Sequence, residues 1–259
     1  KIEVPNVKTW TSEHPNLYKL LMYIKDGDKF TEIVPFNVGF RRIEIKPIEQ
    51  KAANGKPYVC LFINGQPLKL KGVNIHEHNP ATGHYVTEEL MRRDFELMKQ
   101  HNLNSVRLCH YPQDRRFYEL CDELGLYVID RANINAPDRR DDRRVGGTPS
   151  NDPALADEYL ERVKAMYYRS RNHTCVVAFA LGGESGNGYN MYKAYEWLKS
   201  VEKSRPVIYT DADGDGICDN CPAAQTTTSS RGQGNAWHHT AHAGHGHQTG
   251  HHWGGHHGC

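Results

Sequence analysis

The alternation of apolar and polar positions changes character twice along the chain. Up to about residue 45, "LYKLLMYIKDG" and "EIVPFNVGFRRIEI" alternate apolar and polar side chains, with an Asp-Gly turn signal between them. A period of two around a short turn predicts antiparallel strands. Strands of this number and length make up about half of a β-sandwich, so residues 1–46 are predicted to form a partial β-sandwich domain.

From Tyr58 to Tyr209 the pattern changes to short β-rich runs separated by segments with helical spacing. This order is typical of a parallel sheet built from βα repeats, which either closes as a barrel or lies open. The first predicted helix begins behind Thr87 as an N-cap. Helices are predicted over residues 87–102, 114–124, 152–171 and 189–201. Strands are predicted near residues 58–63, 68–73, 104–108, 126–130, 175–180 and 206–209.

The pattern ends at about residue 211. The following "DADGDGICDNCP" is acidic and rich in glycine, and "AAQTTTSSRGQGN" has the composition of a linker. The last stretch, "AWHHTAHAGHGHQTGHHWGGHHGC", holds nine of the 16 histidines and has no apolar period. Residues 211–259 are therefore expected to be a disordered Asp/Gly/Cys- and His-rich tail.

Composition narrows the class of protein and its partners. The 259 residues are 38% hydrophobic and 24% charged, which is typical of a globular protein. A formal net charge of +1 gives no broad attraction to nucleic acid or to an anionic membrane, and neither is expected as a partner. The seven cysteines are too scattered for a disulfide scaffold. Those within apolar runs are predicted to be buried free thiols, namely Cys60, Cys109, Cys121 and Cys175.

Polar residues follow four consecutive predicted strands of the βα region. The carboxyl ends of parallel strands meet at one face, where the working groups of such folds lie. Glu184 is the clearest case, because "AFALGGESGNGYN" ends an apolar run in a carboxylate with glycines on both sides. A carboxyl in a partly enclosed pocket can act as a general acid, although a helix-capping glutamate would show the same pattern. The full set is Asn74, His76, Glu77, His78, His110, Asp130, Asn133, Asn135 and Glu184.

Several of these segments also carry a family resemblance. "FINGQPLKLKGVNIHEHNP", "MKQHNLNSVRLCHYP", "YELCDELGLYVID" and "RSRNHTCVVAFALGGESGNG" resemble the sandwich-to-barrel junction and first barrel half of glycoside hydrolase family 2, most closely its bacterial β-galactosidases. The resemblance covers Trp10 to Tyr209 and leaves the tail outside. It implies an α/β fold in which a partial (β/α)8 TIM-type barrel over residues 47–210 follows part of an immunoglobulin-like β-sandwich.

The resemblance also implies an activity. The expected reaction is hydrolysis of terminal β-D-galactosides by a retaining acid/base mechanism. Glu184 matches the general acid/base, His76 and His110 match histidines that line the sugar pocket, and Asn74 would support the loop. A carbohydrate substrate, a homo-oligomer and a bacterial cytoplasmic or periplasmic location are further expectations.

The chain departs from the family pattern where the family binds magnesium. Arg131 and Asn135 stand where glutamates are usual, and Pro137 stands where a metal-binding histidine is usual. Because Mg²⁺ selects carboxylates and water, its site is predicted to be absent or weak. Gly183 replaces an asparagine that contacts the sugar, and Arg131 could pair with Glu184 and lower its pKa.

A retaining enzyme also needs a second carboxylate as nucleophile. The family places it on a later barrel strand, which has no counterpart here. A catalytically inactive relative or fragment acting in carbohydrate or metal binding is therefore the alternative function.

The tail suggests chemistry of its own. Its aspartates and Gly216 match the first half of a calcium loop and resemble a thrombospondin type 3 repeat, although an acidic turn would look the same. Pro222 stands where an EF-hand has its bidentate glutamate. Cys218 and Cys221 form a single C-x-x-C, a weak zinc or redox signal, and the histidine clusters could bind transition metals or be a flexible appendage. The candidate calcium ligands are Asp211, Asp213, Asp215 and Asp219.

Overall fold

The computed structural model describes residues 3–51, 54–142 and 144–209. All of them belong to one compact unit. The predicted tail over 211–259, with its candidate metal ligands, lies outside the described residues. None of the described helices combines the length and the apolarity needed to span a bilayer.

The N-terminal strands form a hairpin, as the alternating pattern predicts. β1 (Tyr18–Asp26) pairs antiparallel with β2 (Lys29–Val38). Gly27 lies in the turn with a φ of +59°, a left-handed conformation that glycine adopts at little cost. The Asp-Gly signal therefore marks the turn correctly.

A second antiparallel sheet corrects one strand assignment. β3 (Ile43–Lys51) pairs with β4 (Pro57–Ile63), which pairs with β5 (Gln66–Pro67). The predicted strand at 58–63 therefore does not belong to the βα repeats. The segment between β3 and β4 is too short for a parallel crossover, which needs about a dozen residues or more, so an antiparallel return is the available geometry. The predicted domain limit at residue 46 falls inside β3 and stays a prediction.

The remaining strands form a parallel sheet in chain order, as expected of successive βα units. Its first strand begins later than the predicted 68–73, because the backbone N–H of Leu68 still bonds to Leu61 of β4 while Gly72 pairs with Ser105. The predicted parallel sheet is otherwise confirmed. Its strands are β6 (Gly72–Ile75), β7 (Ser105–Leu108), β8 (Tyr127–Arg131), β9 (Val176–Ala180) and β10 (Val207–Ile208).

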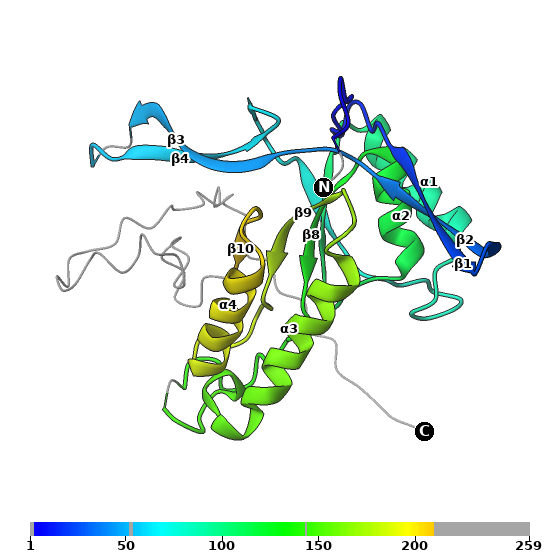
Figure 1. Ribbon diagram of the computed structural model, residues 1–259. Coiled ribbons are helices and arrows are strands. Elements are labelled where there is room, and N and C mark those ends of the chain that lie inside the picture. Colours follow the sequence, from blue (N-terminus) through cyan, green and yellow to red (C-terminus); the bar gives the residue numbers. More distant parts are fainter. Residues whose placement is uncertain (1–2, 52–53, 143, 210–259) are drawn as a thin grey trace, which may run out of the picture. The chain divides into compact units, whose positions relative to one another are not determined.

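Helices connect these strands and lie alongside them (Figure 1). Thr87 caps the first helix with its side chain, as predicted, and Asp114 caps the second in the same way. The third helix begins later than expected, because Pro149–Asn151 and Pro153–Leu155 form 3-10 turns before it. The helices are α1 (Glu88–Gln100), α2 (Arg115–Leu124), α3 (Ala156–Ser170) and α4 (Tyr189–Val201).

One apolar core joins the N-terminal segment to the parallel sheet. Trp10 is fully buried, donates from Nε1 to the carbonyl of Asp122 at 2.9 Å and packs edge-on against Tyr127 of β8. Cys109, Cys121 and Cys175 are buried free thiols as predicted, whereas Cys60 is half-buried. This core fixes the strands whose carboxyl ends carry the candidate site.

Candidate active site

Glu184 lies just beyond the carboxyl end of β9. Leu181 to Gly183 are buried, whereas the Glu184 side chain is exposed. Its φ of +51° is in the left-handed region, which costs a non-glycine residue of order 1–3 kcal/mol and is common at functional sites. The turn is held on both sides, because the backbone N–H of Gly183 donates to Ile134 and the hydroxyl of Ser185 accepts from Ala136. The fold therefore presents this carboxylate at the strand-end face.

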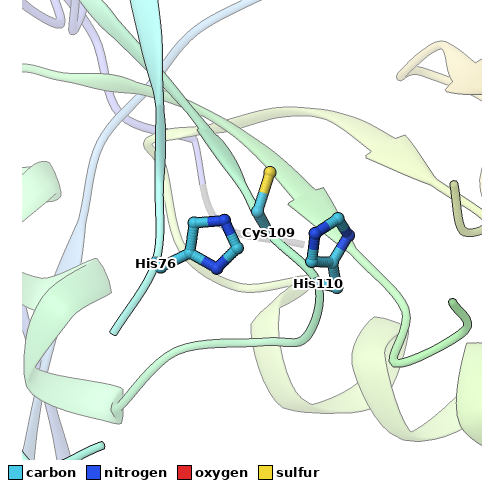
Figure 2. Close-up of side chains that lie close together, drawn as sticks. All are labelled: His76, Cys109 and His110. Atoms are coloured by element: carbon cyan, nitrogen blue, oxygen red, sulfur yellow. The ribbon is translucent and has the colours of Figure 1, made fainter. Parts of the chain in front are cut away.

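His76 and His110 follow the two strands at the other side of the sheet. His76 comes directly after β6 and is exposed, while His110 follows β7 and is half-buried. Their ring centroids lie 5.1 Å apart, and Figure 2 shows both rings beside Cys109. Burial and the charge of Arg131 lower the pKa of His110, and the negative charge of Glu184 opposes that shift. The structure thus brings His76 and His110 together, and it places Glu184 near enough to His110 to affect the pKa of that histidine.

Asn74 takes a different position from these groups. It lies within β6, and its Oδ1 accepts a hydrogen bond from Nη1 of Arg107 on β7 at 3.4 Å. Both residues line a cavity of about 270 Å³. Asn74 therefore contacts the neighbouring strand, and its support of the loop after β6 stays a prediction.

The two other carboxylates near the strand ends are already engaged. Oε1 of Glu77 accepts from the backbone N–H of Asp114, the N-cap of α2. Asp130 is fully buried and accepts hydrogen bonds from the hydroxyls of Tyr118 and Ser170. Burial raises the pKa of Asp130 to about 6, although these hydrogen bonds act to lower it. Both carboxylates hold the scaffold.

Arg131 fills the space beside Gly183. Its side chain is buried, with Nη1 3.8 Å from Sγ of Cys109 and Nη2 3.5 Å from Oδ1 of Asn135. A Cβ atom placed on Gly183 would collide with this guanidinium. The two differences from the family pattern, Arg131 and Gly183, are therefore coupled, because the Arg131 side chain occupies space that a side chain at position 183 would fill. Among the described residues, no ion pair joins Arg131 to Glu184.

The residues at the family's magnesium positions do not fit that ion. Arg131 places a buried cation there, Asn135 offers a neutral amide already contacted by that cation, and Pro137 has no ligand atom in its side chain. Glu184 is the one carboxylate of the set. Mg²⁺ needs several oxygen ligands in octahedral geometry, so this donor set does not fit it, and the loss of the magnesium site stays a prediction.

Replacing Gly183 by asparagine is expected to lower the free energy of unfolding by about 1–3 kcal/mol, because the added side chain overpacks against Arg131. Adding Arg131→Ala should recover most of that loss, which urea denaturation of the two single variants and the double variant measures. The Arg131→Ala single variant completes the cycle and serves as the control for the loss of the arginine itself. If the losses in free energy of unfolding of the two single variants simply add in the double variant, the proposed coupling is contradicted.

Two nearby groups escaped the sequence analysis. Cys109 lies next to His110 but was assigned only a structural role, and Arg107 was not singled out. The signal was present in "RLCHYP", where a cysteine and a histidine end the same strand. A cavity of about 610 Å³ lies elsewhere, between the β1–β2 hairpin and α2, and none of the predicted site residues lines it.

Comparison with known proteins agrees with this arrangement. Residues 58–245 match the TIM barrel domain of glycosyl hydrolases family 2, and residues 1–41 match a second segment of the same family. The chain belongs to glycosyl hydrolases family 2. The barrel match runs past Tyr209 into the tail, which corrects the expectation that the tail lies outside the family.

Relatives within family 2 include named β-galactosidases. The Vibrio cholerae β-galactosidase is 45% identical over 201 residues, covering 77% of this chain and 18% of that enzyme. The Pectobacterium atrosepticum β-galactosidase is 41% identical over 210 residues, covering 81% of this chain and 19% of that enzyme. The chain thus spans about a fifth of the length of these relatives.

Solved structures support the family 2 fold. The β-D-glucuronidase of Dictyoglomus thermophilum superposes with a TM-score of 0.66 at 24% identity, covering 80% of this chain and 35% of that one. A Ruminococcus gnavus β-glucuronidase in complex with a C6-substituted uronic isofagomine superposes with a TM-score of 0.65 at 22% identity, and the match covers 83% of this chain and 35% of that one. At these identities the likeness establishes the fold alone. The partial sandwich followed by a partial TIM-type barrel is confirmed.

Proposed function

We propose that this family 2 chain acts in the retaining hydrolysis of terminal β-D-galactosides, with Glu184 as general acid/base. The observation that carries the proposal is the exposed, left-handed Glu184 at the carboxyl end of β9. The relatives named β-galactosidase, at 45% and 41% identity, support the galactoside as substrate.

The chemistry assigned to Glu184 has two steps. As an acid it protonates the glycosidic oxygen while the leaving group departs, and as a base it later takes a proton from the attacking water. The glycines at 182 and 183 carry no side chain that would obstruct a sugar at this turn. His76 and His110 supply ring nitrogens for hydrogen bonds to galactosyl hydroxyls.

The nucleophile comes from outside the described residues in this proposal. A retaining mechanism places it about 5–5.5 Å from the acid/base. Glu77 and Asp130 are bound to the scaffold, so neither takes that role. In the homo-oligomer that the resemblance implies, a carboxylate of a second copy that lies outside the described residues is one source. Arg131 supplies a fixed positive charge where the family has magnesium, so turnover is proposed to be independent of Mg²⁺.

The test is turnover of a chromogenic aryl β-galactoside by the full chain, with an aryl β-glucuronide alongside. We expect hydrolysis of the galactoside, little of the glucuronide, and equal rates in excess Mg²⁺ and in EDTA. An activated 2-deoxy-2-fluoro-galactoside should label the nucleophile, which peptide mass spectrometry identifies. If the folded protein shows no turnover and no labelling, the hydrolase proposal is overturned.

The second candidate is a catalytically inactive relative or fragment that binds carbohydrate or metal. The engaged carboxylates and the arginine at 131 favour it. Galactose binding without turnover, measured by calorimetry, would select this alternative. Calcium or transition-metal binding by the tail stays a prediction.

A further inference from the structure

Three metal-ligating side chains meet where β6 and β7 end. His76 follows β6, and Cys109 and His110 follow β7. One ligand atom from each, an imidazole nitrogen or Sγ, lies within 4.8 Å of the other two. Figure 2 shows the two rings on either side of the Cys109 side chain. Cys109 is buried and His76 is exposed, so the cluster opens to solvent on one side.

We propose that His76, Cys109 and His110 form a binding site for a thiophilic divalent metal ion such as Zn²⁺. Two imidazoles and a thiolate are a donor set that such ions prefer. Metal–ligand bonds of about 2.0–2.3 Å in a tetrahedral centre place ligand atoms roughly 3.3–3.7 Å apart. The cluster is therefore slightly wider than a loaded site, and side-chain rotation on binding would have to close the difference.

A second observation points to a missing ligand at His110. Its Nδ1 is buried and makes no hydrogen bond to any described residue. A buried polar atom without a partner costs free energy, and most such atoms in folded proteins are satisfied. A metal ion bound through this nitrogen would satisfy it.

The neighbouring arginines decide which metals suit the site. Nη1 of Arg107 lies 3.9 Å from Sγ of Cys109, and Nη1 of Arg131 lies 3.8 Å from it. Two guanidiniums repel a cation held by neutral ligands alone, but they stabilise a thiolate and bond to its sulfur from the second shell. Mg²⁺ and Ca²⁺, which prefer oxygen, are therefore disfavoured, and ions that bond strongly to thiolate remain.

Occupation of this site bears on the proposed function. Three protein ligands leave one coordination position for water. His76 and His110 are also the residues proposed to bind the sugar, so a bound metal and a galactoside would exclude each other. This competition rests on the proposed function, whereas metal binding itself does not.

The test is a Co²⁺ titration of the full chain under reducing conditions. Cys218, Cys221 and Cys259 are replaced by serine, so that the tail keeps its histidines but offers no thiolate. We expect a near-ultraviolet thiolate-to-cobalt charge-transfer band, bleached by Zn²⁺ but not by excess Mg²⁺. Cys109→Ser should abolish the band, and His76→Ala should weaken Co²⁺ binding by more than about tenfold. The matched control, Cys60→Ser, removes another free thiol and should leave the band intact.

A band that survives Cys109→Ser, or no band in the parent, would overturn the site. Turnover of the aryl galactoside separates the two proposals. A band that depends on Cys109, with Zn²⁺ inhibition relieved by chelator, supports both the site and its overlap with the sugar. The same band with unchanged turnover supports the site and contradicts the overlap.

Discussion

Replacing Glu184 by glutamine is expected to lower kcat for an alkyl β-galactoside by about 10²- to 10⁴-fold, the usual contribution of general acid–base catalysis. Glutamine keeps the size of the side chain at this left-handed position and removes the transferable proton. The structural cost should therefore be small, and the loss should lie in chemistry. Steady-state kinetics of the two proteins measure it.

The dependence on leaving group makes this test specific. A nitrophenolate leaves without protonation, so the first step of Glu184→Gln should be far less impaired with an aryl galactoside. Azide, which attacks without needing a base, should then restore turnover and give a β-galactosyl azide. Glu196→Gln, on the exposed face of α4, is the control and should behave as the parent. Equal losses with alkyl and aryl substrates would contradict an acid/base role.

The fold was predictable where local pattern and topology agree. The helical spacing of α1, α2 and α4 and the cap at Thr87 depend on nearby residues, and these predictions are confirmed. The assignment of β4 to the βα repeats was wrong, because its apolar run resembles a buried parallel strand. Its actual partner, β3, is fixed by the short connection between the two strands. Strand pairing of this kind depends on the connection as well as on the run itself.

The site was predictable to the level of strand ends and no further. Polar residues after successive strands had to meet, because parallel strands end at one face. The space that Arg131 takes beside Gly183 depends on side-chain packing between β8 and the turn after β9, which no local pattern encodes. The same holds for Cys109, whose place between two histidines follows from the pairing of β6 with β7.

Glu202→Gln is expected to lower the free energy of unfolding at pH 7 by about 3–5 kcal/mol, the usual cost of breaking a buried ion pair. Glu202 and Arg205 are only 4% and 6% exposed, and the carboxylate accepts hydrogen bonds from Nε and Nη2 of the arginine. The guanidinium of Arg205 lies over the ring of Phe179, 4.5 Å from the ring centroid. Phe179 belongs to β9, the strand that leads to Glu184. Glutamine would leave this buried cation without its counter-charge.

The pH dependence follows from the same contacts. Burial acts to raise the pKa of Glu202, but hydrogen bonds from Ser204 and Arg205 outweigh it and lower the pKa from 4.5 to about 2. A depressed pKa stabilises the fold above pH 4.5, and that contribution, roughly 3 kcal/mol, is lost as the pH falls towards 2. Urea denaturation between pH 2 and 7 should show this loss in the parent and not in Glu202→Gln.

Glu196→Gln provides the matched control, because Glu196 pairs with Lys193 on the exposed side of α4 and both side chains are about half exposed. Glu196→Gln should lower the free energy of unfolding by less than about 1 kcal/mol. A loss that small for Glu202→Gln as well would mean that the buried pair adds little to stability. A large loss for Glu202→Gln alone would show that this contact holds β10 and α4 against the strand that positions the proposed acid/base.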